Sequence, residues 1–261
     1  MTIPDILALD FDGVCCDGLR EYFETSRRTC ARVWPADGPP AESAYVTFCA
    51  LRPVILSGWE MPLLLRAIAR GIPRAEILTG WERVRGELVA AESPAGDALI
   101  ARLGLALDEV RHEWIAADEA GWIARHAPYG SVDELRRLVA EPGRSVLVTT
   151  KEGAFARRIL DHWGVRLADV QGKETGVHKC LNLRALIATW HAERGARPRL
   201  TFVEDRLETL QHVTTHPDLD DVRLFLAAWG YNTAAARAVA RTDGRIRLLT
   251  LDQFRQGSAA W

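Results

Sequence analysis

The sequence has no apolar run of the roughly 18 to 20 residues that a membrane-spanning helix needs. It also has no excess of charge of one sign, because 33 basic and 35 acidic residues give a formal net charge of -2. This balance argues against broad binding to nucleic acid or to anionic membranes. The N-terminus has no basic segment, and Asp5 and Asp10 interrupt its apolar stretch, so it does not resemble a signal peptide. We therefore expect a cytoplasmic protein that binds neither nucleic acid nor membranes.

Cysteine and lysine are both scarce. The cysteines are odd in number and have no C-x-x-C spacing, which indicates neither a disulfide framework nor a zinc site; they lie at 15, 16, 30, 49 and 180. Lysine supplies only three of the 33 basic residues, and all three fall within one stretch of 29 residues: Lys151, Lys173 and Lys179. Because a compact ammonium differs chemically from a planar guanidinium, we expect at least one lysine to have a defined chemical role.

The 261 residues are 48% hydrophobic and 26% charged, as is typical of a globular chain. An apolar strand is predicted at 6–10, followed by a long section of helical periodicity with helices at about 60–70, 74–92, 97–103 and 108–126. Ser131 and Glu134 have the spacing of a capping box at the start of a short helix. Residues 18–128 contain no segment that clearly predicts a strand.

From residue 145 onward, apolar strands alternate with helices. The predicted strands are 145–149, 167–171, 200–204, 222–228 and 246–250, and the predicted helices are 153–163, 180–194, 206–213 and 233–241. This alternation is typical of a parallel sheet covered by helices on both faces. The predicted fold is α/β: a doubly wound parallel sheet formed by 1–17 and 129–261, with an inserted helical domain at 18–128.

Ligand sites in such sheets lie beyond the carboxyl ends of the strands. Acids, hydroxyls and lysines follow the predicted strands there: Asp10 and Asp12, then Thr149, Thr150 and Lys151, then Lys173 and Lys179, then Glu204 and Asp205. Carboxylates at one edge suit Mg²⁺, with Asp10 and Asp205 as the natural pair of ligands. The hydroxyl of Thr149 and a lysine ammonium suit an anionic phosphoryl group.

The segments DFDGV, VLVTTK and TFVEDR, with a lysine near a helix start between the last two, resemble motifs I to IV of the haloacid dehalogenase superfamily. The resemblance implies that Asp10 is a nucleophile that forms an aspartyl-phosphate. It implies that Asp12 is the general acid and base and binds the metal through its backbone carbonyl. Thr149 and a lysine would hold the phosphoryl group, and Asp205 would bind Mg²⁺. An acid at position 12 is typical of the phosphatases of this superfamily rather than of its dehalogenases.

Two motifs leave alternatives open. For the motif III lysine we favour Lys179, about eight residues past the strand and at a helix start, over Lys173. Lys151 is interpreted as a solvated residue at a helix start. In motif IV, Glu204 stands where Gly or Asp is commoner, so either Glu204 or Glu208 could take part in metal binding.

The helical insert resembles a C1-type cap, which closes over a site and selects the substrate. Within it, Arg52 in LRPVILSGWEMP is a candidate for binding a substrate anion, as Thr150 is in the core. We therefore predict a Mg²⁺-dependent phosphatase of a small, phosphoglycolate-like metabolite, acting as a monomer or homodimer. The alternatives are another reaction of the superfamily (phosphonate or carbon–halogen hydrolysis) and a non-catalytic binding protein on the same fold.

Overall fold

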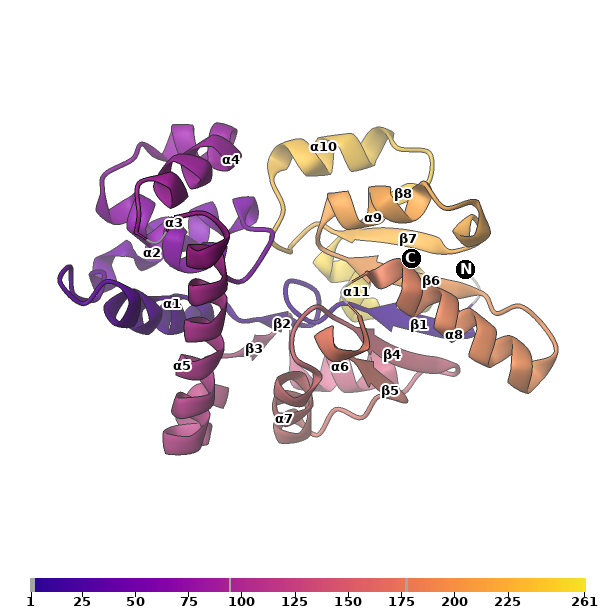
Figure 1. Ribbon diagram of the computed structural model, residues 1–261. Helices are drawn as coiled ribbons and strands as arrows, with labels where there is room; N and C mark the ends of the chain where they lie inside the picture. The colour runs from indigo at the N-terminus through magenta and orange to yellow at the C-terminus, as the bar shows by residue number, and fades with distance from the viewer. Residues whose placement is uncertain (1–2, 94, 177) are drawn as a thin grey trace. The chain divides into compact units, whose positions relative to one another are not determined.

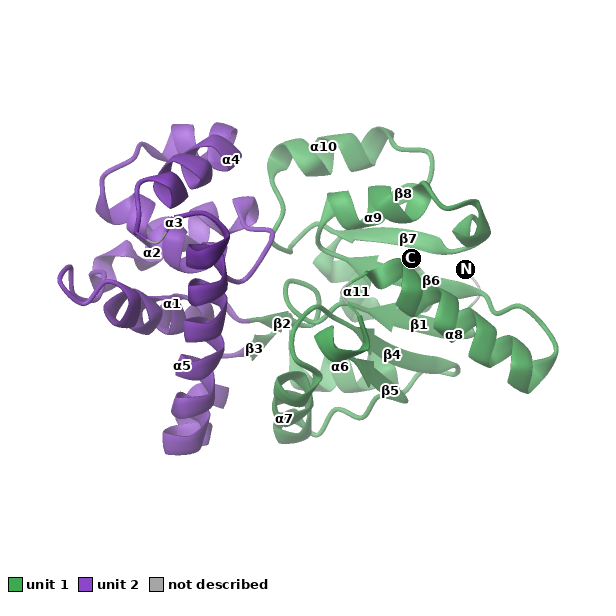
Figure 2. Ribbon diagram, in the orientation of Figure 1, with its two compact units in different colours: residues 1–17, 127–261 green, residues 18–126 purple. Residues whose placement is uncertain are grey.

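The computed structural model describes residues 3–93, 95–176 and 178–261 (Figure 1). The chain divides into two compact units (Figure 2): a core unit of Met1–Asp17 with Ala127–Trp261, and a helical unit of Gly18–His126. The sequence-based boundary between insert and core, at 128/129, lies two residues away from this division. Residues 1 and 2 of the predicted core segment lie outside the described residues.

The core unit contains a six-stranded parallel sheet, as predicted. Its strands, in spatial order, are β5 (Asp169–Gln171), β4 (Arg144–Val148), β1 (Ile6–Leu9), β6 (Leu200–Glu204), β7 (Arg223–Ala227) and β8 (Ile246–Leu249). The chain runs from β1 to β4 and β5 on one side, and then from β6 to β8 on the other. The order therefore reverses at β1, which is where α/β sheets bind ligands.

Helices cover both faces of this sheet (Figure 1). They are α6 (Val132–Val139), α7 (Gly153–Trp163), α8 (Lys179–Arg194), α9 (Leu207–Thr214), α10 (Ala234–Thr242) and α11 (Leu251–Gln256). Leu224 of β7 belongs to the buried cluster that includes Leu183 of α8 and Leu210 of α9. Its neighbour Phe225 contacts Trp261 instead, with ring centroids 5.7 Å apart, because successive residues of a strand point to opposite faces.

Local signals set several element ends. Helix α6 begins at the predicted capping box, in which the Glu134 amide donates to Ser131 Oγ at 3.1 Å and the Ser131 amide donates to the Glu134 carboxylate at 2.8 Å.

The short 3-10 helices are η1 (Glu42–Ala44), η2 (Arg52–Val54), η3 (Lys173–Thr175), η4 (Pro217–Leu219) and η5 (Ser258–Ala260). A two-residue strand β2 (Cys16–Asp17) pairs with β3 (Ala127–Pro128), where the chain leaves and re-enters the core unit. Such short strands carry no periodicity, so the sequence did not predict them.

The helical unit contains α1 (Leu19–Val33), α2 (Tyr45–Leu51), α3 (Glu60–Ala69), α4 (Arg74–Ala90) and α5 (Asp97–Ile123). The residues between the helices predicted at 97–103 and 108–126 are helical as well, so both predicted helices fall within α5, which is kinked at Asp118 by a non-helical backbone (φ -157°, ψ 76°). A buried ion pair joins α5 to α1, with Arg111 Nε 2.7 Å from Glu21 Oε1, and Trp122 Nε1 donates to the same oxygen at 3.2 Å. Among the described residues, no helix is long and apolar enough to cross a bilayer.

Candidate active site

A tight turn follows β1 and carries the two aspartates of the DFDGV segment. Asp10 is buried, and its amide donates to Val203 O of β6 at 2.9 Å. Gly13 has φ +85°, and a Cβ atom there would lie 2.2 Å from Asp205 Oδ2. Only glycine combines this left-handed backbone with so close an approach. The glycine after the acid pair therefore lets the end of β1 pack directly against the acid that follows β6.

Asp205 is held in place from both sides. Its Oδ2 accepts a hydrogen bond from the Tyr231 amide at 2.8 Å, and its backbone oxygen accepts one from Asn232 Nδ2 at 3.0 Å. A Cβ atom on Gly230 would lie 2.3 Å from Asp205 Cβ. The carboxylate is thus fixed beside the end of β1 by two glycines and a backbone amide.

Lys179, the first residue of α8, bridges two of the acids. Its Nζ lies 2.9 Å from Asp10 Oδ1 and 2.5 Å from Glu204 Oε2. The other oxygen of Glu204 accepts from the backbone amides of Asp205 at 3.1 Å and Arg206 at 3.0 Å. Lys173 lies in η3, where its Nζ is 3.4 Å from Glu152. Of the two lysines left open by the sequence, the structure therefore brings Lys179 to Asp10.

Burial dominates the electrostatics of this site. It raises the pKa of Asp10 to about 7, against the opposing effect of the Lys179 charge. It likewise raises the pKa of Glu204 to about 7, again opposed by Lys179. Burial acts to lower the pKa of Lys179, but the two carboxylates together raise it above its ordinary value. A single ammonium thus shares a buried space with Asp10, Glu204 and the neighbouring Asp205.

Asp10, Glu204 and Asp205 form a group that we call the carboxylate cluster. Each offers one oxygen, and the three atoms lie within 4.8 Å of one another. The donors are hard oxygens in a buried site with an excess of negative charge, and both properties fit Mg²⁺. Asp10 and Asp205 would hold the ion, because Glu204 already accepts from Lys179 and two backbone amides. Glu208 lies apart from the cluster, with its exposed carboxylate 3.5 Å from Arg206.

The segment after β4 brings a hydroxyl and a second ammonium to the same edge. Thr149 is buried, and its Oγ1 accepts from the Lys151 amide at 3.1 Å, while Thr150 is exposed. Lys151 Nζ lies 3.3 Å from Asp12 Oδ1, and only 5% of the Lys151 side chain is exposed. The interpretation of Lys151 as a solvated residue is therefore wrong, because its ammonium turns back over the sheet edge to a carboxylate partner.

Arg52 lies in the helical unit, whereas Cys15 and Cys16 follow the acid pair in the core unit. Arg52, in η2 of the helical unit, donates to Ile55 O at 3.1 Å and lies 5.2 Å from the ring centre of Tyr22; its role toward a substrate stays a prediction. Cys15 and Cys16 are buried, and burial raises the pKa of both thiols. Both are therefore protonated and unsuited to act as nucleophiles.

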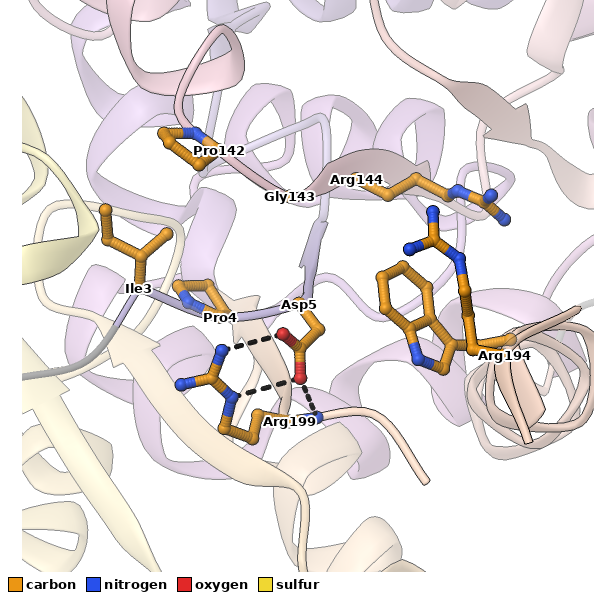
Figure 3. Close-up of a pocket in the computed structure, with 9 residues that line it drawn as sticks. Ile3, Pro4, Asp5, Pro142, Gly143, Arg144, Arg194 and Arg199 are labelled. Atoms are coloured by element: carbon orange, nitrogen blue, oxygen red, sulfur yellow. Dashed lines mark hydrogen bonds and ion pairs between the residues drawn. The ribbon is translucent and has the colours of Figure 1, made fainter. Parts of the chain in front are cut away.

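A pocket at the opposite, amino-terminal edge of the sheet contains a different group of residues (Figure 3). Arg199 is tied to Asp5, with Nη2 2.7 Å from Oδ1, and Arg144 is tied to Glu193 at 2.7 Å. Figure 3 shows the guanidinium groups of Arg144 and Arg194 beside an indole ring, that of Trp190, and their centres lie 5.5 and 4.9 Å from its centroid. None of the predicted site residues lines this pocket.

No protein-family model and no curated protein matches the sequence. Solved structures do match across nearly the whole chain. A predicted phosphoglycolate phosphatase from Haemophilus somnus has a TM-score of 0.61 at 12% identity, with 98% of each chain covered. A haloacid dehalogenase-like hydrolase from Streptococcus pneumoniae has a TM-score of 0.56 at 11% identity, covering 95% of this chain and 94% of that one. Protein Tyrosine Kinase A from Mycobacterium tuberculosis has a TM-score of 0.60 at 18% identity, with 98% of each chain covered.

These identities are low, but the likeness extends over the sheet and the helical insert together. In this chain the segments that resemble the four motifs lie at the ends of β1, β4 and β6 and at the start of α8. The chain has the fold of the haloacid dehalogenase-like hydrolases, with a helical unit inserted after the first strand.

Proposed function

We propose that the chain is a Mg²⁺-dependent phosphatase that hydrolyses a small phosphorylated metabolite through an aspartyl-phosphate on Asp10. The observation that carries the proposal is the contact of Lys179 with Asp10 inside the carboxylate cluster. Fold alone does not decide the reaction, since one structural neighbour bears the name of a kinase. We further propose a cytoplasmic location and a monomeric or homodimeric state.

The residues divide the reaction into two displacements. In the first, an Asp10 oxygen attacks phosphorus, the bond to the leaving alkoxide breaks, and Asp12 supplies the proton that the alkoxide takes up. In the second, water attacks the aspartyl-phosphate, Asp12 accepts its proton, and the bond between Asp10 and phosphorus breaks to release phosphate. Lys179 offsets repulsion between the carboxylate and the phosphoryl dianion, and Thr149 would hold a phosphoryl oxygen. A bound Mg²⁺ would neutralise the developing negative charge.

The acid at position 12 favours hydrolysis of phosphate monoesters over hydrolysis of carbon–halogen bonds. A haloalkane releases halide, which needs no proton, whereas an alkoxide does. Asp12 lies only two residues past the nucleophile and has a lysine partner at 3.3 Å, so the structure supports a residue held ready for proton transfer. A phosphoglycolate-like substrate stays a proposal that a screen of phosphorylated metabolites would test.

Metal removal is the first test. After exhaustive EDTA treatment we expect no turnover of p-nitrophenyl phosphate, with recovery on adding Mg²⁺, because two buried carboxylates would otherwise repel the phosphoryl group. Ca²⁺ should restore little activity, since it takes more ligands in looser geometry and would misplace the nucleophile. Full activity in the treated protein would rule out the metal requirement.

The second test concerns Lys151. Replacing it with Met should lower kcat for an alkyl phosphate on the order of tenfold or more with little change in KM, because Asp12 loses the group that positions it. The deficit should be smaller with p-nitrophenyl phosphate, whose leaving group departs without a proton. Lys173→Met is the matched control and should leave both rates near normal. Equal losses on both substrates would show that Lys151 does not act through Asp12.

A further inference from the structure

A second group of metal-binding side chains lies between α8 and α9, away from the carboxylate cluster. It consists of Cys180 in the first turn of α8, His212 in α9 and His216 just beyond α9. The thiol sulfur and one nitrogen of each imidazole all lie within 4.8 Å of one another. The histidines are four residues apart, one in the last turn of α9 and one just beyond it, and their ring centroids are 4.9 Å apart.

The three side chains are available to a ligand. Cys180 is a free thiol, 3% exposed. The hydrogen bonds of His212 and His216 among the described residues use their backbone atoms. Arg184, whose charge acts on Cys180, is itself paired with Asp218, with Nε 2.6 Å from Oδ2. The exposed side of the group, at His212, gives an ion a path from solvent.

The donor set selects the kind of metal. One thiolate and two imidazoles are typical ligands of Zn²⁺, with bonds of about 2.3 Å to sulfur and about 2.0 to 2.1 Å to nitrogen. Three protein ligands leave the fourth tetrahedral position to water. The carboxylate cluster offers only oxygens and suits Mg²⁺, so the two groups differ in the ion that they prefer.

We propose that Cys180, His212 and His216 form a Zn²⁺ site that joins α8 to α9. The ion replaces the thiol proton, which passes to solvent. Cys180 directly follows Lys179, so the bound ion would fix the same turn of α8 that presents Lys179 to Asp10. α9 begins two residues after Asp205, and the site therefore ties together the two helices that follow the candidate catalytic residues.

Co²⁺ is the probe for this site, used on the full chain with Mg²⁺ in excess to occupy the oxygen ligands. Stoichiometric Co²⁺ should give a thiolate-to-metal charge-transfer band in the near ultraviolet and the strong visible bands of tetrahedral coordination, and Zn²⁺ should abolish both. Cys180→Ser should lose the charge-transfer band, and His216→Gln should weaken Zn²⁺ binding at least about tenfold, as expected for a lost ligand. Cys49→Ser, which changes a cysteine of the helical unit, should keep wild-type spectra and affinity.

Thermal unfolding gives an independent measurement. With Mg²⁺ present, Zn²⁺ should raise the Tm of the wild type and of Cys49→Ser, but not that of Cys180→Ser or of His212→Gln. The histidine variant changes an exposed side chain, so it tests the site even where Cys180→Ser fails to fold. A charge-transfer band that persists in Cys180→Ser, or a wild-type spectrum without such a band, would overturn the proposal.

Discussion

Asp10→Asn is expected to abolish turnover, with a loss on the order of 10⁴-fold or more. The amide keeps the volume of the side chain, but it cannot form an acyl-phosphate with the substrate. It also removes the negative charge that lies 2.9 Å from Lys179 Nζ. The measurement is steady-state release of phosphate at saturating Mg²⁺, with thermal unfolding to verify that the variant folds. Asp252→Asn, which neutralises an acid whose side chain is 86% exposed, is the matched control and should be fully active.

Asp12→Asn separates the covalent mechanism from direct attack by water. It should slow turnover on the order of 10²-fold or more, because the proton donor and acceptor is lost while the nucleophile remains. With a substrate labelled on the phosphoryl group, Asp12→Asn should retain label on the protein, and Asp10→Asn should retain none. Substantial steady-state activity in Asp10→Asn would eliminate the aspartyl-phosphate.

The sheet and its active edge could be predicted because the relevant signals are local. Each strand is a short apolar run, and parallel strands covered on both faces have continuous apolar sequences. An acid directly after such a run must lie at the carboxyl edge. This reasoning places Asp10 and Asp205 correctly, since they follow neighbouring strands.

Residues in longer loops were harder to place. Lys173 and Lys179 both follow β5, and only the start of α8 decides which of them faces Asp10. The sequence around Lys151 predicts a solvated residue, because its ion-pair partner Asp12 lies in the turn after a different strand, β1. The two residues are 139 positions apart in the sequence, and no local pattern around either of them predicts the contact.

The group at Cys180 illustrates the same limit. Zinc sites are recognised in sequence by closely spaced cysteines and histidines, and this one joins a cysteine to two histidines more than 30 residues away. The packing of α8 against α9 brings them together. The cysteine count predicts neither a disulfide nor a zinc site, and the structure shows the five cysteines as free thiols. Only the three-dimensional arrangement points to a metal.

Glu204 shows what a departure from the commoner motif can do. A Gly or Asp at this position could not span the distance to the α8 lysine in the same way, whereas Glu204 reaches Lys179 at 2.5 Å and accepts two backbone amides. Its position suggests that it anchors the lysine more than it binds metal. A change at Glu204 should therefore affect the same step of the reaction as a change at Lys179.

Lys179→Ala should lower kcat/KM by about 10² to 10³-fold, or roughly 3 to 4 kcal/mol of transition-state stabilisation, as for other preorganised electrostatic donors. It also leaves Asp10 and Glu204 buried without their shared cation, so a fall in stability is expected as well. The double variant Lys179→Met with Glu204→Gln removes a buried positive and a buried negative charge together. It should recover much of the stability but little of the activity.

Replacing Lys179 with arginine, which keeps the positive charge, tests whether the site requires the compact ammonium of lysine. Lys179→Arg should rescue little activity, because a longer planar group cannot occupy the position of a compact ammonium between two carboxylates. Lys173→Ala should cost less than about twofold, since that side chain is 38% exposed and pairs with Glu152 rather than with Asp10. Steady-state kinetics of the three single variants decide the assignment. If Lys173→Ala is inactive while Lys179→Ala is near normal, the roles of the two lysines are exchanged, and the contact with Asp10 is not the one that the reaction uses.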